Sequence, residues 1–324
     1  MYRQLALAAI LFFVALPAHA QFATNEPLTV TVTPDTPRPY ETVTVTPGST
    51  LVNLAAARIT VTVNGTVIEN GGGVQGVPVT VAGAGGTTNI TVTAVVGGQT
   101  YTKKLALRPA DVALVVEPVS TTHPFYLGAA LTAPVGRLRI IAIPDLRTAP
   151  NTRLAASSLV YTWKWGDKVL AEQSGIGRST FSAIAPVQYR DAQITCTVTS
   201  ADGSLIATAS TVISPTNAVA RMYPVDSLKG PDFDHAVTGT YVMSGDEAAF
   251  RGIAYFFGAT PSLAWSVNGQ SASTEQDVTV RTTGSGEGTA SLSFAAKNTD
   301  TSQDASSALS VHFGAKKATN IFGF

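Results

Sequence analysis

The sequence has few of the residues on which disulfides, electrostatic binding and most catalysis depend. It contains one cysteine and four histidines, only 13% of its residues are charged, and 21 Lys and Arg balance 21 Asp and Glu. A single cysteine cannot form a disulfide within the chain, so packing alone must hold the core. Neutrality argues against a nucleic-acid partner, because basic side chains that neutralise phosphates dominate such binding.

Catalytic motifs are missing as well. Serine is frequent, but no G-x-S-x-G nucleophile elbow and no metalloprotease helix motif occurs. Beyond the first twenty residues the histidines are His123, His235 and His312, each in a different local sequence. Cys196 lies in an alternating apolar and polar stretch, which favours a buried small hydrophobe over a thiolate nucleophile. We therefore expect a protein that is not an enzyme and that uses no cofactor.

Long hydrophobic runs are also scarce. The run from Leu5 to Leu16 follows Arg3 and precedes the small-x-small triplet Ala18-His19-Ala20. It is shorter than the roughly 20 apolar residues of a membrane-spanning helix. Residues 1–20 are thus predicted to be a signal peptide cleaved before Gln21, with retention as an anchor as the alternative. The mature chain is expected outside the cytoplasm (secreted, periplasmic or on the cell surface), with no membrane span.

What the sequence does contain is a repeated strand. The stretches ITVTVNG, YTWKWGD and LAWSVNG begin at Ile59, Tyr161 and Leu263, and successive copies start 102 residues apart. Each alternates apolar and polar residues and then meets a turn pair that contains glycine, a pattern typical of a half-buried strand entering a hairpin. Equal spacing of matched strands indicates three copies of one module.

A second alternating strand follows each copy at a similar interval. Its central residue lies 31, 33 and 29 residues further along in the pairs Val61 and Val92, Trp163 and Cys196, Trp265 and Phe294. A difference of two residues is ordinary loop variation. We predict domains at residues 21–110, 111–215 and 216–313, each close to the roughly 100 residues of an immunoglobulin-type sandwich.

The Trp163 strand followed by DAQITCTVTS resembles the C and F strands of immunoglobulin-like domains. The chain as a whole resembles bacterial exported surface proteins built from tandem Ig-like or PKD-like β-sandwiches. It departs from the family pattern because Cys196 occupies the place of the second domain cysteine while no first cysteine exists. The resemblance implies an all-β fold of three tandem Ig-like sandwiches after an N-terminal signal peptide.

Two tryptophans could form either a core or an exposed platform for a ligand. The repeat aligns Trp163 and Trp265 with Val61, and an aliphatic residue at the equivalent position indicates burial. A buried Trp on this strand is usual in Ig-type sandwiches. The predicted core positions are Trp163, Trp265, Val61, Cys196, Val92 and Phe294. Trp165, at the end of its strand, or Trp265 would favour a role in binding a glycan or another small ligand if it were exposed beside polar partners.

Two further features of the sequence bear on metal and phosphate binding. Asp232, Asp234, Asp246 and Glu247 are weak candidates for calcium ligands, but the EF-hand ligand order is absent, so no metal site is predicted. The glycine-rich stretches NGGGVQG and GAGGTTN lack the ending of a phosphate-binding loop and are predicted to be hairpin loops.

The final segment, residues 314–324, is apolar at its end, where Ile321, Phe322 and Phe324 lie after two lysines. Termini are usually polar and mobile, so this segment either folds back on the last module or docks on a partner, for example by adding a strand to a sheet edge. The three apolar residues are therefore candidate docking residues.

Together these features predict a non-catalytic, extracytoplasmic structural and interaction protein. Its modules would act as a spacer or as an adhesion or assembly module at the cell envelope, with a protein partner there. Two alternatives stay open: a protein that binds a glycan or small ligand through loops at a sandwich end, and a component of an envelope appendage or secretion assembly that docks through its C-terminal tail.

Overall fold

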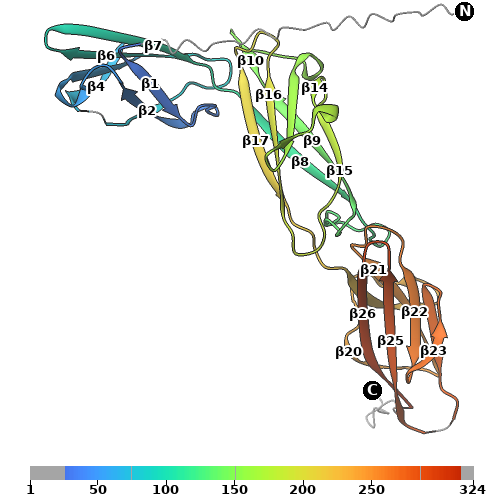
Figure 1. The fold of residues 1–324 in the computed structure, drawn as a ribbon. Coiled ribbons are helices and arrows are strands. Elements are labelled where there is room, and N and C mark those ends of the chain that lie inside the picture. Colours follow the sequence, from blue (N-terminus) through green and yellow to red (C-terminus); the bar gives the residue numbers. More distant parts are fainter. Residues whose placement is uncertain (1–25, 74, 150, 285, 315–324) are drawn as a thin grey trace, which may run out of the picture. The chain divides into compact units, whose positions relative to one another are not determined.

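The computed structural model describes residues 26–73, 75–149, 151–284 and 286–314 (Figure 1). Strands make up nearly all of its regular structure, and the helices within these ranges are three single turns of 3-10 type: η1 (Leu54–Ala56), η2 (Ala156–Ser158) and η3 (Ala171–Gln173). The predicted all-β fold is confirmed. None of the helices in these ranges is long and apolar enough to cross a membrane. The predicted signal peptide and the tail residues Ile321, Phe322 and Phe324 lie outside the described residues.

The chain separates into two compact units. Of the described residues, 26–32, 44–78 and 89–105 belong to one unit, and 33–43, 79–88 and 106–314 belong to the other. Several strands of the N-terminal sheets contain residues of both units, whereas the sheets after residue 110 lie wholly in the second unit.

The N-terminal part contains a three-stranded and a four-stranded sheet. The first has the order β1 (Thr29–Thr33), β2 (Thr42–Gly48), β5 (Val77–Thr80); the second has the order β4 (Thr66–Gly72), β3 (Arg58–Val63), β6 (Thr88–Val96), β7 (Gln99–Leu107). Val and Thr alternate along β2, β3 and β6, a composition that favours strands with one buried face. Accordingly Val61, Ile90 and Val92 are fully buried.

The middle sandwich, residues 111–213, contains two main sheets. One has the order β15 (Thr180–Ile184), β9 (Arg137–Asp145), β8 (Asp111–Val119); the other has the order β13 (Lys168–Val169), β12 (Val160–Trp165), β16 (Ala192–Thr199), β17 (Ile206–Ile213), with β14 (Gly175–Ile176) also paired to β12. A short ribbon joins β10 (Arg147–Thr148) to β11 (Thr152–Arg153). One continuous core lies between the main sheets and includes Ile140, Trp163, Phe181 and Ile194.

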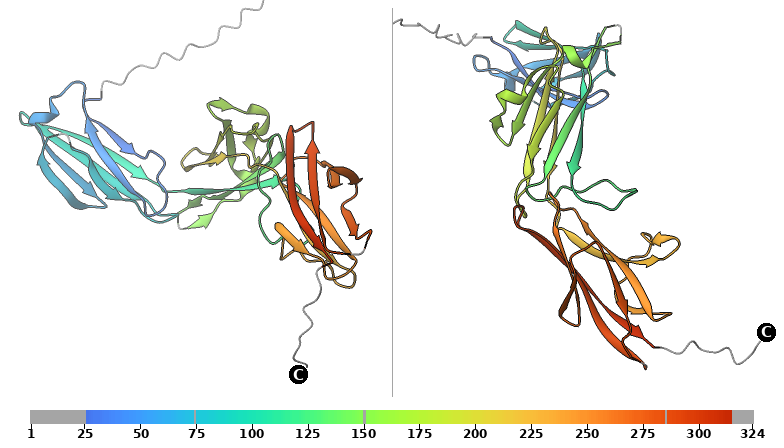
Figure 2. Two further views of the ribbon diagram at one scale, coloured as in Figure 1. Left: turned by 90° about the horizontal axis from the view of Figure 1, so that it is seen from below. Right: turned by 90° about the vertical axis from the view of Figure 1, so that its right-hand side faces the viewer.

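The C-terminal sandwich, residues 219–313, repeats this plan, and its two layers are visible in Figures 1 and 2. One sheet has the order β19 (Gly230–Pro231), β18 (Val219–Asp226), β21 (Glu247–Tyr255), β24 (Asp277–Arg281); the other has the order β20 (Gly239–Val242), β26 (Gln303–Phe313), β25 (Gly288–Asn298), β22 (Ser262–Val267), β23 (Gln270–Ser273). Strand β20 pairs in parallel with β26. Strand β20 thus forms the edge of its sheet beside β26. In the described part of the middle sandwich, the corresponding sheet ends at β17 without such an added strand.

One turn is repeated with the same hydrogen bonds. Asn64 and Asn268 both have φ +49° and precede a glycine. The Asn64 side chain accepts a bond of 2.9 Å from the Asn89 N–H, and the Asn268 side chain accepts a bond of 2.9 Å from the Ser291 N–H. Asn tolerates the left-handed conformation that this turn requires better than most residues do. The two turns therefore tie equivalent strands together in the N-terminal and C-terminal sheets.

The structure corrects the prediction for the two glycine-rich stretches. Gly71 and Gly72 are the end of β4, where they pair with Ile59 and Arg58. Gly85 has φ +78° in a turn between β5 and β6. Because β5 and β6 belong to different sheets, that turn links two sheets and is not a hairpin loop.

Candidate interaction surface

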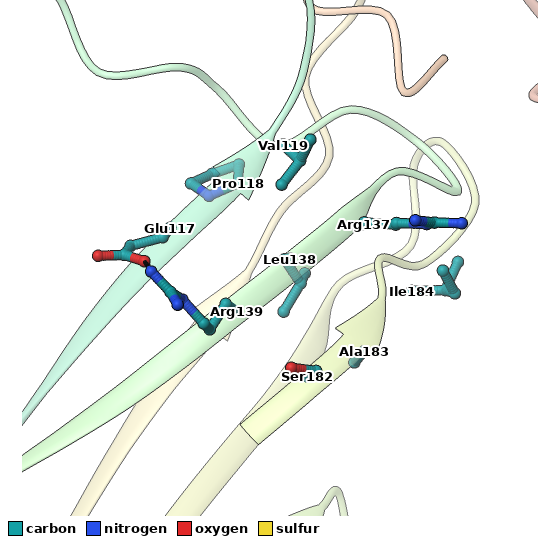
Figure 3. Close-up of a pocket in the computed structure, with 9 residues that line it drawn as sticks. All are labelled: Glu117, Pro118, Val119, Arg137, Leu138, Arg139, Ser182, Ala183 and Ile184. Atoms are coloured by element: carbon teal, nitrogen blue, oxygen red, sulfur yellow. Dashed lines mark hydrogen bonds and ion pairs between the residues drawn. The ribbon is translucent and has the colours of Figure 1, made fainter. Parts of the chain in front are cut away.

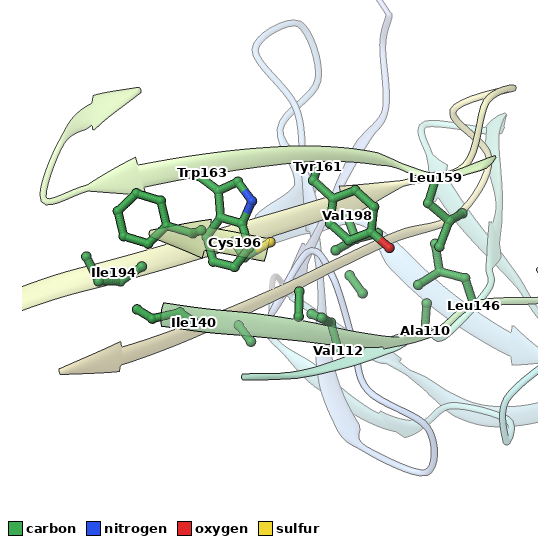
Figure 4. Close-up of a cluster of buried hydrophobic side chains, with 14 of the residues drawn as sticks. Ala110, Val112, Ile140, Leu146, Leu159, Tyr161, Trp163, Ile194, Cys196 and Val198 are labelled. Carbon is green, nitrogen blue, oxygen red and sulfur yellow. The ribbon is translucent and has the colours of Figure 1, made fainter. Parts of the chain in front are cut away.

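The predicted core residues lie in pairs on neighbouring strands. Val61 pairs with Val92, Trp163 with Cys196, and Trp265 with Phe294. Each of the six residues is at most 1% exposed to solvent. Figure 4 shows the Trp163 ring above Cys196 inside the middle sandwich. Residues predicted to be equivalent therefore occupy equivalent places in the sheets.

The two buried indoles also satisfy their polar atoms. Trp163 Nε1 donates to the Arg178 carbonyl at 2.8 Å, and Trp265 Nε1 donates to the Glu275 carbonyl at 3.0 Å. A buried indole N–H without a partner would be costly, so these bonds make burial possible. Neither ring presents a face to solvent for a ligand.

Trp165 is less buried than Trp163 and Trp265. It is partly buried, and its ring centroid lies 6.1 Å from that of Phe181 on the facing sheet. Its side chain thus contributes to the edge of the core.

The Cys196 thiol is chemically quiet. Its side chain is fully buried, and burial raises the pKa of the thiol to about 12. Since the thiolate is the reactive form, the thiol has no nucleophilic character near neutral pH.

Of the four acidic candidates for calcium ligands, Asp232 and Glu247 have structural partners for their carboxylates. Asp232 contacts His235 Nδ1 at 3.0 Å and accepts from the Asp234 N–H at 3.1 Å. Glu247 pairs with Arg281 at 2.7 Å across β21 and β24. For Asp246, the backbone carbonyl accepts from the Thr282 N–H at 2.9 Å. Within the described ranges no three His, Cys, Asp or Glu side chains gather as metal ligands would.

The surface that remains unexplained by the core is the outer face of β8, β9 and β15. Antiparallel register places cross-strand partners on the same face, so outward residues form rows across the sheet. One row is Val119, Arg137 and Ile184; another is Glu117, Arg139 and Ser182; a third is Val115, Ile141 and Thr180. The inward neighbours Leu138, Ile140 and Phe181 fill the core. We call these three rows the β8–β9–β15 face.

Aliphatic side chains on this face are open to solvent. Val119 is 60% exposed and Ile184 is 51% exposed, although outward positions of a solvated sheet are usually polar. Arg137 lies between them in the same row. Glu117 accepts from Arg139 Nε at 2.8 Å in the next row. A groove of about 680 Å³ follows these residues, with the Glu117 and Arg139 pair along one side (Figure 3).

The free edge of β15 is partly closed. The Gln173 side chain accepts from the Ser182 N–H at 3.1 Å and donates to the Ser182 carbonyl at 2.8 Å. A side-chain amide thus replaces the backbone of a further strand, a device that opposes edge-to-edge pairing. The face of the sheet, rather than this edge, is therefore the open part.

The segment 120–136 continues from β8 and carries the most exposed apolar side chains nearby. Phe125 is 92% exposed and Leu127 is 102% exposed, and no Lys, Arg, Asp or Glu occurs in the segment. The residue between them, Tyr126, is half-buried against Tyr255 and Phe256. The exposed side chains of Phe125 and Leu127 thus lie on either side of Tyr126 in the chain, and Tyr126 is held by its ring contacts. This arrangement suits contact with an apolar partner.

Sequence reasoning missed this surface. The signal was present in RLRIIAIPD from Arg137, where Ile141 and Ile143 continue the outward face that Arg137 and Arg139 begin. A strand with apolar residues on both faces indicates either a second buried face or an interface. The rows themselves, which join strands far apart in the sequence, require the register.

Solved structures of tandem β-sandwich proteins are similar to this chain. Immunoglobulin domains 1–5 of Sidekick-1 match with a TM-score of 0.31 and 11% identity over 88% of this chain and 58% of that one. Three N-terminal domains of the bacteriophage RB49 highly immunogenic outer capsid protein match with a TM-score of 0.26 and 13% identity over 90% and 99%. The central fibronectin-III array of RIM-binding protein matches with a TM-score of 0.29 and 11% identity over 89% and 97%.

This chain therefore spans 58% of the length of the Sidekick-1 structure. No protein-family model matches the chain, and no curated protein sequence matches it significantly. At these TM-scores the likenesses carry no argument about function. The tandem Ig-like β-sandwich fold rests on the sheets themselves.

Proposed function

We propose that this chain is a non-catalytic structural and interaction protein that acts outside the cytoplasm, at the cell envelope. Its Ig-like sandwiches, divided at residues 21–110, 111–215 and 216–313, serve as a spacer that presents a binding surface. The signal-peptide pattern of residues 1–20 supports the location. The partner is a protein, bound through the β8–β9–β15 face.

The observation that carries this proposal is the exposed aliphatic pair Val119 and Ile184 with Arg137 between them. Burial of exposed apolar side chains supplies the main favourable term in protein association. A central cationic or hydrogen-bonding group adds specificity, and Arg is enriched at such sites. The internal Glu117 and Arg139 pair leaves Arg137 as the charge that faces a partner.

Site-specific photo-crosslinking in the cells that make the protein tests the proposal. A photoreactive phenylalanine analogue replaces Val119, Ile184 or Phe125 in the full chain, and Val169 is the control because it is a valine of similar exposure (48%) on the opposite sheet. We expect a discrete protein adduct at the three test positions and none at Val169.

Arg137→Glu supplies the second arm of this experiment. It should reduce the adduct formed at Ile184 by at least about tenfold, the ratio that corresponds to 1.4 kcal/mol of binding free energy. The proposal fails if the adducts form equally at Val169, if no position gives an adduct, or if Arg137→Glu leaves the yield unchanged.

A further inference from the structure

The segment that follows β8 in the middle sandwich is hydrogen-bonded to the C-terminal sandwich. The Thr121 N–H donates to the Phe257 carbonyl at 3.0 Å, and the Thr121 carbonyl accepts from the Phe256 N–H at 2.8 Å. The hydroxyl of Thr121 donates to the Ala254 carbonyl at 2.7 Å and accepts from the Phe257 N–H at 3.0 Å. Thr121 thus makes four hydrogen bonds to residues 254–257, at and just after the end of β21.

Aromatic rings add to this contact. The His123 ring stacks on Phe233 with centroids 4.4 Å apart, and Tyr126 lies 5.9 Å from Tyr255. Tyr223 and Tyr255, which are buried, share a hydrogen bond of 2.7 Å between their hydroxyls. Tyr223 and Tyr255 lie on the outer face of β18 and β21, because their chain neighbours Met222 and Ala254 pack in the core on the other side of the sheet.

The two sandwiches also meet backbone to backbone. A Cβ on Gly258 would lie 2.8 Å from the Gly136 Cα, 3.2 Å from its nitrogen and 3.3 Å from the Pro134 carbonyl. Only glycine allows so close an approach of two main chains. The Gln303 side chain fixes this corner from within the C-terminal sandwich, because it donates to the Phe256 carbonyl at 2.9 Å and accepts from the Gly258 N–H at 2.8 Å.

Tandem sandwiches joined by short linkers ordinarily move relative to each other unless a substantial interface restrains them. Here the restraint comes from three kinds of contact made by one segment. Thr121 forms backbone and hydroxyl hydrogen bonds, His123 and Tyr126 pack in an aromatic cluster, and the main chain at Gly136 closely approaches that at Gly258. From these contacts we infer that residues 120–136 lock the middle and C-terminal sandwiches into a single rigid body. The lock refines the spacer role of the proposed function and does not depend on the identity of the partner.

The lock also bears on the exposed tip of the same segment. Tyr126 is held by the aromatic cluster, and Phe125 and Leu127 flank it in the chain. A fixed base reduces the conformational entropy that these two side chains lose when a partner binds. The segment therefore both joins the sandwiches and pre-orients two apolar side chains.

Residual dipolar couplings of the full-length chain test the lock. Amides of a rigid pair of sandwiches share one alignment tensor, so we expect a single tensor to fit residues 137–213 and 247–313 in the wild type. The double variant Thr121→Val with Gly258→Ala removes the hydroxyl bonds and forces the backbones apart, and it should require two tensors.

The matched control is Thr122→Val with Gly245→Ala. Gly245 has no atom within 4 Å of an added Cβ, and the Thr122 hydroxyl makes no hydrogen bond within the described ranges. The control should keep one tensor. The indole signals of Trp163 and Trp265 report that each sandwich is folded. Two tensors in the wild type, or one tensor in the folded double variant, would overturn the inference.

If the double variant loses the Trp265 signal, Thr121→Val alone carries the test through hydrogen exchange. The Phe257 amide donates to the Thr121 hydroxyl and should exchange about five- to tenfold faster in this variant, the effect of losing one net hydrogen bond. Unchanged exchange at Phe257 would contradict the lock. The outcome is separate from the crosslinking experiment, which reports on a partner and not on the junction.

Discussion

Trp163 and Cys196 are cross-strand partners on β12 and β16. This pair places a large aromatic ring beside a small side chain. The same strand positions hold Trp265 with Phe294 and Val61 with Val92. Each pair fills the same place in its sheet with a different volume. The surrounding core must differ accordingly, because protein interiors are close-packed.

This difference predicts which substitutions Cys196 tolerates. Cys196→Val, which copies Val92, should cost less than about 1.5 kcal/mol of unfolding free energy because it nearly conserves volume. Cys196→Phe, which copies Phe294, should cost about 1–3 kcal/mol because Cys196 and Trp163 are both fully buried and the larger ring must displace its neighbours. Urea unfolding of the two full-length variants measures both values. Equal costs would show that the core beside Trp163 accommodates the larger ring without displacing its neighbours.

Truncation of Trp163 should be far more damaging than truncation of its neighbour. Trp163→Ala removes a fully buried ring and should lower the unfolding free energy of the middle sandwich by about 3–5 kcal/mol. Trp165→Ala should cost clearly less, since that ring is only partly buried. Urea unfolding followed by circular dichroism compares the two. Similar losses in both variants would argue against the burial difference.

Gly252 marks a tightly packed position in the C-terminal core. A Cβ at this position would lie 2.4 Å from the Phe294 ring, so Gly252→Ala must displace that ring. We expect a loss of about 1–3 kcal/mol, the usual cost of overpacking. Gly245→Ala, where the added methyl meets open space, is the control and should change little. The midpoint of thermal unfolding distinguishes them, and equal midpoints would refute the packing.

The turn between β16 and β17 contains a carboxylate with a lowered pKa. Asp202 accepts from the Ser200 hydroxyl at 2.6 Å and from the Ser204 N–H at 3.1 Å, and these bonds lower its pKa from 3.8 to about 2. A lowered pKa in the folded state means that the stabilising effect is complete above the unfolded value and is lost as the pH falls toward 2.

NMR titration of the Asp202 carboxyl carbon checks this directly. We expect a midpoint near 2 in the wild type. Ser200→Ala removes the main hydrogen bond and should move the midpoint upward, toward 3.8. A wild-type midpoint near 3.8 would show that the turn does not hold the carboxylate as described.

The regular parts of the fold were accessible from the sequence because they are local. Alternation of apolar and polar residues identified the strands that carry Val61, Trp163 and Trp265, and turn residues such as Asn64 and Asn268 marked their ends. The stretch around Gly71 was predicted wrongly as a loop. Glycine usually weakens a strand, but the pairing of Gly71 with Ile59 on β3 keeps it in the sheet here.

The candidate surface could not be predicted in the same way. Its rows join Val119 to Ile184 through Arg137, residues that only the register of three strands brings together. The parallel strand β20 and the contact of Thr121 with Phe257 likewise join segments more than about 60 residues apart. Pairing over such separations depends on the whole fold, so local patterns leave it open.

The most direct test of the account measures exchange of the three indole N–H protons, one for each tryptophan in the chain. The sandwich cores require Trp163 and Trp265 to be buried with their N–H groups bonded to the carbonyls of Arg178 and Glu275. We predict that both indole protons exchange only through unfolding, over hours or longer, while Trp165 exchanges faster. Rapid exchange at Trp163 or Trp265 would contradict the cores on which the proposed function rests.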